Sequence, residues 1–158
     1  MAMPEHSTEP HLVTLEPVTV AAIRETVPMS ALTGFFDRVF RATMATAQQQ
    51  GIPVVGPPVA VYYQMPSDTV DVAGGFPTAS PVEPDGDVHP VDLPGGQAAQ
   101  VMHVGSYDSL EQTYGRLMAW MREQQHTPAE VMWEAYLNEP DPDRPDEAQT
   151  LIVWPLAG

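Results

Sequence analysis

The chain has 158 residues, 43% of them hydrophobic, which suits a single globular domain with a substantial core. Its 21 acidic and 6 basic residues give a formal net charge of −15, which repels phosphate backbones and argues against direct nucleic-acid binding. The absence of cysteine excludes disulfides and thiolate sites, and the five histidines lack metal-ligand spacing. Without a membrane-spanning apolar run or a signal pattern, we expect a cytoplasmic protein with no metal, other cofactor or membrane partner.

The first half of the chain is predicted to form one strand, one helix and a hairpin. Residues 1–14 lack periodicity and are expected to be a loose N-terminal tail, so that a single domain covers residues 15–158. Ser30 is predicted to cap a helix that Gly51 ends. The predicted elements are strand Val18–Glu25, helix Ala31–Gln50 with an apolar face of Leu32, Phe35, Phe36, Val39 and Phe40, and strands Val59–Gln64 and Thr69–Phe76.

The second half is predicted to follow a Pro-rich connection over residues 77–86 and to contain the same kinds of element. Asp108 is predicted to cap its helix, with Glu111 three residues later in a capping-box arrangement. The helix ends near Gln125 and buries Leu110, Tyr114, Leu117, Met118 and Met121. The predicted strands are Val88–Leu93, Gln97–Val104, Val131–Leu137 and Thr150–Trp154.

The order strand, helix, strand, strand therefore occurs twice, in halves of about 15–80 and 87–156. A shift of 78 residues superposes Leu32 on Leu110 and Phe36 on Tyr114, and a shift of 74 superposes the later strands. The second shift makes Tyr62 the mate of Tyr136 and Ala60 the mate of Glu134. If a pseudo-twofold axis relates the halves, Glu134 breaks the symmetry of a groove between them, and such grooves often bind ligands.

Glu134 is an unusual residue for the centre of an apolar strand. Alternation along Val131–Leu137 puts Met132, Glu134 and Tyr136 on one face, and Trp133 belongs to the opposite, core-like face. A thioether, a carboxylate and a phenol together could line a pocket for an apolar cation. The alternative is a half-exposed strand whose acid points into solvent.

Several segments resemble the gyrase-inhibitor-like (GyrI-like) small-molecule and effector-binding domain family. They are the runs His103–Tyr107, Trp133–Pro140 and Thr150–Leu156, and in the first half the Gly56–Pro58 segment and Tyr62. The resemblance implies an α+β fold: duplicated strand-helix-strand-strand modules form one antiparallel sheet with two long helices and a central groove. Such domains end drug-sensing regulators of the MerR and AraC types. This chain starts almost at the domain and resembles a stand-alone member, whose regulator partner would be a separate chain.

The resemblance also implies a site, with an acid at the position of Glu134 as counter-charge to a cationic or amphipathic aromatic ligand. The aromatic residues expected around it can stack on such a ligand, and the methionines can adapt to its shape. Tyr107 could instead lock the turn between strand and helix, and His103 is expected to serve packing or a hydrogen bond. The expected ligand-binding residues are Tyr62, Met102, Tyr107, Met132, Glu134, Tyr136 and Trp154.

We expect drug or effector binding more than catalysis. Two other functions stay open. The first is hydrolysis of cyclopropane-bearing aromatic natural products, as the resemblance to hydrolases of the family implies, with Glu134 and Tyr136 or Tyr62 directing water. The second is inhibition of a gyrase-like protein partner through the acidic surface. Heme binding is a weaker alternative, because no histidine occupies a groove position in this reading.

Overall fold

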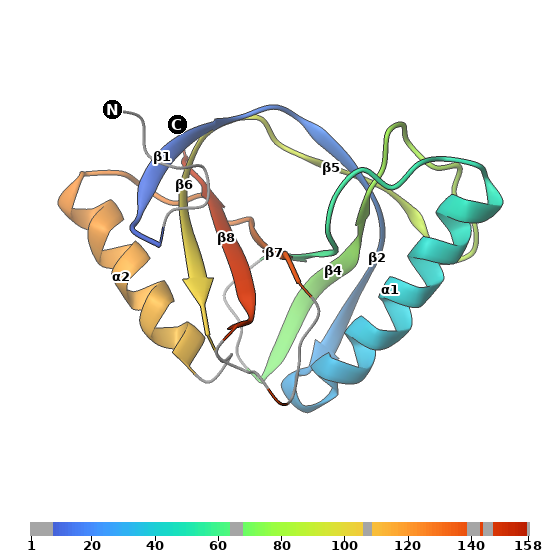
Figure 1. Ribbon diagram of the computed structural model, residues 1–158, viewed down its shortest axis with the longest axis horizontal. Coiled ribbons are helices and arrows are strands. Elements are labelled where there is room, and N and C mark those ends of the chain that lie inside the picture. Colours follow the sequence, from blue (N-terminus) through green and yellow to red (C-terminus); the bar gives the residue numbers. More distant parts are fainter. Residues whose placement is uncertain (1–7, 64–67, 106–108, 139–142, 144–146, 158) are drawn as a thin grey trace. The chain divides into compact units, whose positions relative to one another are not determined.

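The structure is a computed structural model that describes residues 8–63, 68–105, 109–138, 143 and 147–157 (Figure 1). The chain divides into two compact units: unit 1 comprises residues 1–15 and 96–158, and unit 2 comprises residues 16–95. In chain order the elements are β1 (His11–Leu15), β2 (Val18–Pro28), the 3-10 helix η1 (Met29–Ala31), α1 (Leu32–Gln49), β3 (Val59–Tyr62), β4 (Thr69–Pro77), β5 (His89–Leu93), β6 (Gly96–Val104), α2 (Leu110–Glu123), β7 (Met132–Tyr136) and β8 (Gln149–Pro155).

Unit 2 is one continuous stretch of chain, and its four strands pair antiparallel in the order β3-β4-β2-β5. Helix α1 packs on β2 and β4, as Figure 1 shows. The predicted aromatic stripe of α1 faces this sheet, with Phe35 and Val39 fully buried and Phe36 and Phe40 partly buried against the same core. The 3.6-residue period of apolar side chains therefore drives the packing of this helix.

Unit 1 pairs four strands antiparallel in the order β1-β6-β8-β7. Helix α2 packs along β6 (Figure 1), and it buries Thr113, Leu117 and Met121. Unit 1 is discontinuous in sequence, because its edge strand β1 comes from the first 15 residues of the chain.

The two units repeat one another down to the strand register. A shift of 78 residues carries the β1–β6 pair Leu15–Gly96 onto the β5–β2 pair Leu93–Val18, and the β2–β4 register onto the β6–β8 register. With the predicted shift of 74 for β3, the pair Tyr62–Val72 becomes Tyr136–Thr150. The predicted α+β class, with antiparallel strands, two long helices and duplicated strand-helix-strand-strand modules, is confirmed.

Most predicted elements lie within a few residues of their observed bounds, and Gly51 follows α1 with the left-handed φ of 68° expected there. Two details were wrong. Residues 11–14, expected in the tail, lie in β1, because pairing with β6 satisfies their backbone despite a sequence too short to show periodicity. Ser30 lies in η1 and α1 begins without a side-chain cap. The predicted cap at Asp108 lies outside the described residues.

No helix in the described parts of the chain has the length and apolar character needed to cross a membrane.

Candidate functional site

Glu134 lies at the centre of β7, on the face of the unit 1 sheet that α2 covers. Residues directly opposite one another on adjacent strands share a face, and Val101, Ile152 and Glu134 form such a row across β6, β8 and β7. The Glu134 side chain is only 5% exposed, in a row whose other two members are fully buried and apolar. The alternative of an acid pointing into solvent is therefore wrong.

Two tyrosine hydroxyls donate hydrogen bonds to the Glu134 carboxylate. Tyr136, two residues further along β7, donates to Oε1 over 2.8 Å. Tyr114, from α2, donates to Oε2 and also lies 3.8 Å from Met132 Sδ. Helix and strand thus each supply one donor, so that both oxygens of the buried carboxylate are hydrogen-bonded.

The surroundings of Glu134 favour its neutral form. Burial raises the pKa of the Glu134 carboxyl above its ordinary value of 4.5, because ionisation would place a charge away from water. The hydrogen bonds from Tyr114 and Tyr136 and the field of His103 oppose this rise in pKa without cancelling it. A cation next to Glu134 would remove the cost of ionising it.

Aromatic and thioether groups surround this carboxyl on the same face. The Tyr114 and Trp154 rings meet edge to face, with centroids 6.4 Å apart and planes at 79°. Trp154 is buried, and its indole Nε1 donates to the carbonyl oxygen of Ala129 over 2.8 Å, which holds the ring in place. Met132, Trp154 and Tyr136, all predicted ligand residues, therefore lie with Glu134 in unit 1.

A second row of polar residues runs beside the first, formed by His103, Thr150 and Tyr136 on β6, β8 and β7. His103 is buried, and its Nδ1 lies 2.6 Å from the hydroxyl of Thr113 on α2. Its Nε2 lies 3.4 Å from the hydroxyl of Ser109. His103 thus makes hydrogen bonds, as predicted for it, and it lies on the same face of the sheet as Glu134.

The structure does not bring every predicted ligand residue to this face. Met102 pairs with Leu151, and Leu151 pairs with Ala135, so Met102 lies on the opposite face of the unit 1 sheet from Glu134. Tyr62 belongs to unit 2, where it packs against the core beside α1. Tyr107 lies outside the described residues.

Tyr114 is the site residue that was not selected from the sequence, where it was assigned only to the buried face of its helix. Its mate in unit 2 is Phe36, which stacks on Phe40 with centroids 5.5 Å apart and planes at 9°. Likewise the mate of Glu134 is Ala60, and a Cβ on Gly74, the mate of Ile152, would lie 2.7 Å from Val39. Unit 2 is close-packed and apolar where unit 1 carries an acid and a hydroxyl, so comparing mates would have identified Tyr114.

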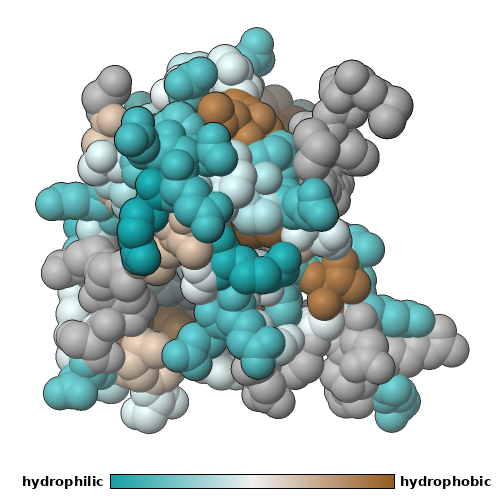
Figure 2. All heavy atoms as spheres, turned by 90° about the vertical axis from the view of Figure 1, so that its left-hand side faces the viewer, coloured by the Kyte–Doolittle hydropathy of each residue, from teal (hydrophilic) through white to brown (hydrophobic). Residues whose placement is uncertain are grey.

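The outer face of α2 is polar. Figure 2 views the molecule from the side that carries α2 and shows a mostly hydrophilic surface with isolated hydrophobic areas. The exposed side chains of α2 include Glu111, Gln112, Arg116, Arg122 and Glu123. Helix α2 therefore directs Tyr114 toward Glu134 and presents charge to solvent.

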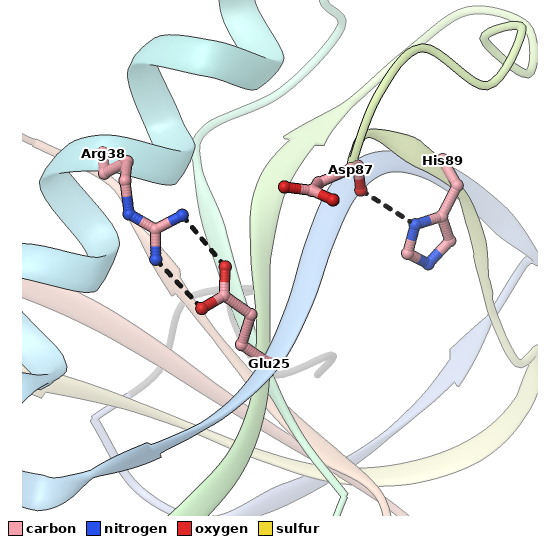
Figure 3. Close-up of polar contacts among 4 residues, drawn as sticks. All are labelled: Glu25, Arg38, Asp87 and His89. Atoms are coloured by element: carbon pink, nitrogen blue, oxygen red, sulfur yellow. Dashed lines mark hydrogen bonds and ion pairs between the residues drawn. The ribbon is translucent and has the colours of Figure 1, made fainter.

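A separate polar cluster lies on the surface of unit 2 (Figure 3). Arg38 makes a bidentate ion pair with Glu25, with N–O distances of 2.9 and 3.1 Å, and His89 Nδ1 lies 3.2 Å from the carbonyl oxygen of Asp87. Glu25, Asp87 and His89 border an open depression of about 540 Å³. Exposed pairs of this kind are screened by water and contribute little to stability. Among the described residues, no group of three or more His, Asp or Glu side chains could hold a metal ion.

The comparisons with known proteins agree with this geometry. The GyrI-like small molecule binding domain model matches residues 8–157. No curated protein sequence matches the chain.

Three solved proteins share the fold at low sequence identity. The EcmrR C-terminal domain has a TM-score of 0.82 at 19% identity, covering 94% of this chain and 97% of that one. The match to EcmrR in the EcmrR–DNA complex has a TM-score of 0.81 at 20% identity, covering 94% of this chain and 57% of the EcmrR chain. SAV2435, bound to tetraphenylphosphonium, has a TM-score of 0.64 at 15% identity, covering 95% and 94% of the two chains. A hydrolase from Listeria innocua has a TM-score of 0.64 at 13% identity, covering 96% and 93%.

Proposed function

The chain belongs to the GyrI-like small molecule binding domain family, and from this premise we propose that it binds a small aromatic cation with Glu134 as the counter-charge. The observation that carries the proposal is the buried carboxyl of Glu134, held by two tyrosine hydroxyls on the α2-covered face of unit 1.

Electrostatics supports a cation over a neutral ligand. The described hydrogen-bond partners of Glu134 are the hydroxyls of Tyr114 and Tyr136, and the described ion pairs of arginine lie in unit 2. A buried carboxylate without a cationic partner is costly, which explains the raised pKa of Glu134. A lipophilic cation would supply the missing charge, at little desolvation cost to itself. The net charge of −15 would also attract cations to the molecule.

The aromatic groups supply the second half of the recognition. The rings of Tyr114, Tyr136 and Trp154 could contact the aromatic parts of such a ligand, each contributing about 0.5–2 kcal/mol through stacking and cation–π contacts. Met132 Sδ lies beside Tyr114 and could adapt to ligands of different shape. SAV2435, which shares the fold, was solved with tetraphenylphosphonium, a cation of this chemical class.

The test is a calorimetric titration with tetraphenylphosphonium and with the neutral triphenylphosphine oxide. We expect the wild type to prefer the cation, and Glu134→Gln to lower its affinity for the cation by on the order of 2 kcal/mol, about 30-fold. Affinity for the phosphine oxide should change little. Equal losses for both compounds, or no loss, would remove Glu134 from this role.

The matched control is Glu123→Gln. Glu123 is an exposed acid at the end of α2, in the same unit as Glu134. Its substitution removes the same charge from the surface field and should leave the affinity for tetraphenylphosphonium unchanged at moderate salt, because exposed charges are screened. A loss similar to that of Glu134→Gln would assign the cation preference to the overall charge of the protein.

A second candidate function is hydrolysis of an electrophilic aromatic compound, such as a cyclopropane-bearing natural product. The observation that favours it is the raised pKa of Glu134 beside the Tyr136 hydroxyl, since a neutral buried acid can donate a proton in a reaction. The similarity to the Listeria hydrolase is one of fold. Incubation followed by mass spectrometry separates the candidates: a ligand that gains one water, with loss of turnover in Glu134→Gln, indicates hydrolysis, and an unchanged ligand indicates binding.

The biological use of such binding is proposed to be effector sensing or sequestration. The fold makes up only part of the EcmrR chain, and the structure of EcmrR was solved in complex with DNA. We propose that the present chain meets a regulator as a partner protein, since its own charge disfavours contact with DNA. Co-purification from cells with and without tetraphenylphosphonium tests this: a DNA-binding partner recovered in only one condition supports sensing, and no partner in either condition supports sequestration.

A further inference from the structure

Thr150 carries a buried hydroxyl that makes no hydrogen bond within the described part of the chain. Its side chain is 0% exposed, and Oγ1 has no hydrogen-bond partner among the described residues. Buried hydroxyls are normally hydrogen-bonded, because losing water without gaining a partner costs free energy. The Thr150 hydroxyl therefore reduces the stability of the fold unless another group uses it.

Unit 2 shows that the fold does not need this hydroxyl. The mate of Thr150 is Val72, which is also 0% exposed and lies in the equivalent row between Glu25 and Tyr62. Valine and threonine have nearly the same shape and differ by a methyl group in place of a hydroxyl. The apolar residue fills the equivalent space in unit 2, so packing alone does not account for the hydroxyl of Thr150.

The neighbours of Thr150 place it in the candidate site. It lies directly between His103 and Tyr136 on the α2-covered face, and Tyr136 is the residue that donates to Glu134 Oε1. Directly opposite residues in antiparallel strands have Cβ atoms about 4.5–5.5 Å apart. The Thr150 hydroxyl is thus one strand spacing from Tyr136 and one row from Glu134.

We propose that Thr150 is a specificity residue of the ligand site, whose hydroxyl hydrogen-bonds an uncharged oxygen of the ligand while Glu134 holds the ligand's cationic centre. The inference rests on the proposed function and adds a ligand class to it: aromatic cations that carry a hydroxyl, ether or carbonyl oxygen near the charge. An uncharged oxygen suits the position, since a second cation would meet the first and an anion would meet Glu134.

The ligand reaches Thr150 by displacing Tyr136. A cation at Glu134 competes with the Tyr136 hydroxyl for the carboxylate oxygen, and Tyr136 is partly exposed, so its ring can move toward solvent. Movement of that ring uncovers the next residue in its row, which is Thr150. A threonine hydroxyl can donate or accept, so it can serve each of the oxygen types named above.

The experiment compares two cations that differ by one oxygen: (methylphenyl)triphenylphosphonium and (hydroxymethylphenyl)triphenylphosphonium, each as its 3- and 4-isomer. We expect the wild type to prefer one hydroxymethyl isomer over its methyl counterpart by about fivefold to tenfold. In Thr150→Val this preference should fall to about one, because only the ligand with the oxygen loses a hydrogen bond. The melting temperature of the variant without ligand should rise by a few degrees.

Val72→Thr is the matched control, since it places the same hydroxyl at the equivalent position of unit 2. It should lower the melting temperature and leave the ligand preference at the wild-type value. A preference that survives Thr150→Val, or a wild type that shows none with either isomer, overturns the role of Thr150 and leaves the cation site standing. Failure of the wild type to bind any of these phosphonium ions overturns the proposed function, and the Thr150 inference with it.

Discussion

Glu134 and Ala60 hold equivalent positions in two strands, β7 and β3, that pair with β8 and β4 in the same register. The difference between these two residues separates an apolar, close-packed unit from one that buries an acid. Because the backbone register is the same, the properties of unit 1 that depend on this acid can be tested with unit 2 as an internal reference.

The affinity for an aromatic cation should rise with pH. Glu134 has a raised pKa, so at low pH it is neutral and a cation must displace its proton on binding. We expect tetraphenylphosphonium affinity to increase as the pH rises up to the raised pKa of Glu134, with proton release over the same range. Calorimetry in two buffers of different ionisation enthalpy measures that release. A flat profile, or the same slope in Glu134→Gln, would contradict the assignment.

The stability of the protein without ligand should show the opposite trend. Well below 4.5, the ordinary pKa of this carboxyl, Glu134 is protonated in both the folded and unfolded states. Above it the unfolded state loses the proton first, so the free energy of unfolding falls as the pH rises through the raised pKa. Glu134→Gln lacks this titrating group. The free energy of unfolding of the variant, relative to that of the wild type, should therefore increase as the pH rises over that window. Urea denaturation of both proteins at several pH values checks the sign, and a constant difference would contradict it.

Each of the two tyrosines that donate to Glu134 should affect the pH at which its carboxyl titrates. Tyr136 donates to Oε1 and Tyr114 to Oε2, and both hydrogen bonds hold the pKa of Glu134 lower than burial alone would. Tyr136→Phe and Tyr114→Phe should each move the pH midpoint of cation binding upward, because each variant removes a hydrogen bond that favours the ionised carboxylate. Tyr62→Phe, the mate of Tyr136 in unit 2, should leave that midpoint unchanged. An unshifted midpoint in both of the first two variants would show that the hydroxyls do not bind the carboxylate in solution.

The close approach of β4 to β2 leaves no room for a side chain at Gly75. A Cβ at Gly75 would lie 1.8 Å from the carbonyl oxygen of Ala21, so the backbone itself would have to move. We expect Gly75→Ala to destabilise the fold by about 3 kcal/mol or more. Gly115→Ala is the control: a Cβ there meets nothing within 4 Å, and alanine should stabilise α2 by about 1 kcal/mol. Urea midpoints that move alike in the two variants would contradict this reading of the strand packing.

Most helices and strands could be predicted from the sequence because the periods of their apolar side chains are strong. The stripe of Phe35, Phe36, Val39 and Phe40 repeats at helical spacing, and the strand around Glu134 is short, apolar and bounded by turns. The duplication was visible for the same reason, since a constant shift of 78 residues aligns both helices and the strands that precede them.

The faces of the strands were not predictable to the same degree. Alternation states which residues of one strand share a face, but it does not relate that face to a neighbouring strand. Only the register shows that Met102 pairs through Leu151 with Ala135 and so lies opposite Glu134. The pairing of residues 11–15 with β6 was equally hidden, because five residues carry too little pattern to identify a distant partner.

The location of β1 affects the order in which the chain can fold. Every strand of unit 2 has been synthesised once residue 95 leaves the ribosome, so this unit can fold while synthesis continues. Unit 1 must close a long loop, since His11 pairs with Gln100, and it also awaits the C-terminal strand β8 at the centre of its sheet. The unit that holds Glu134 is therefore completed after unit 2, which can already be folded by then.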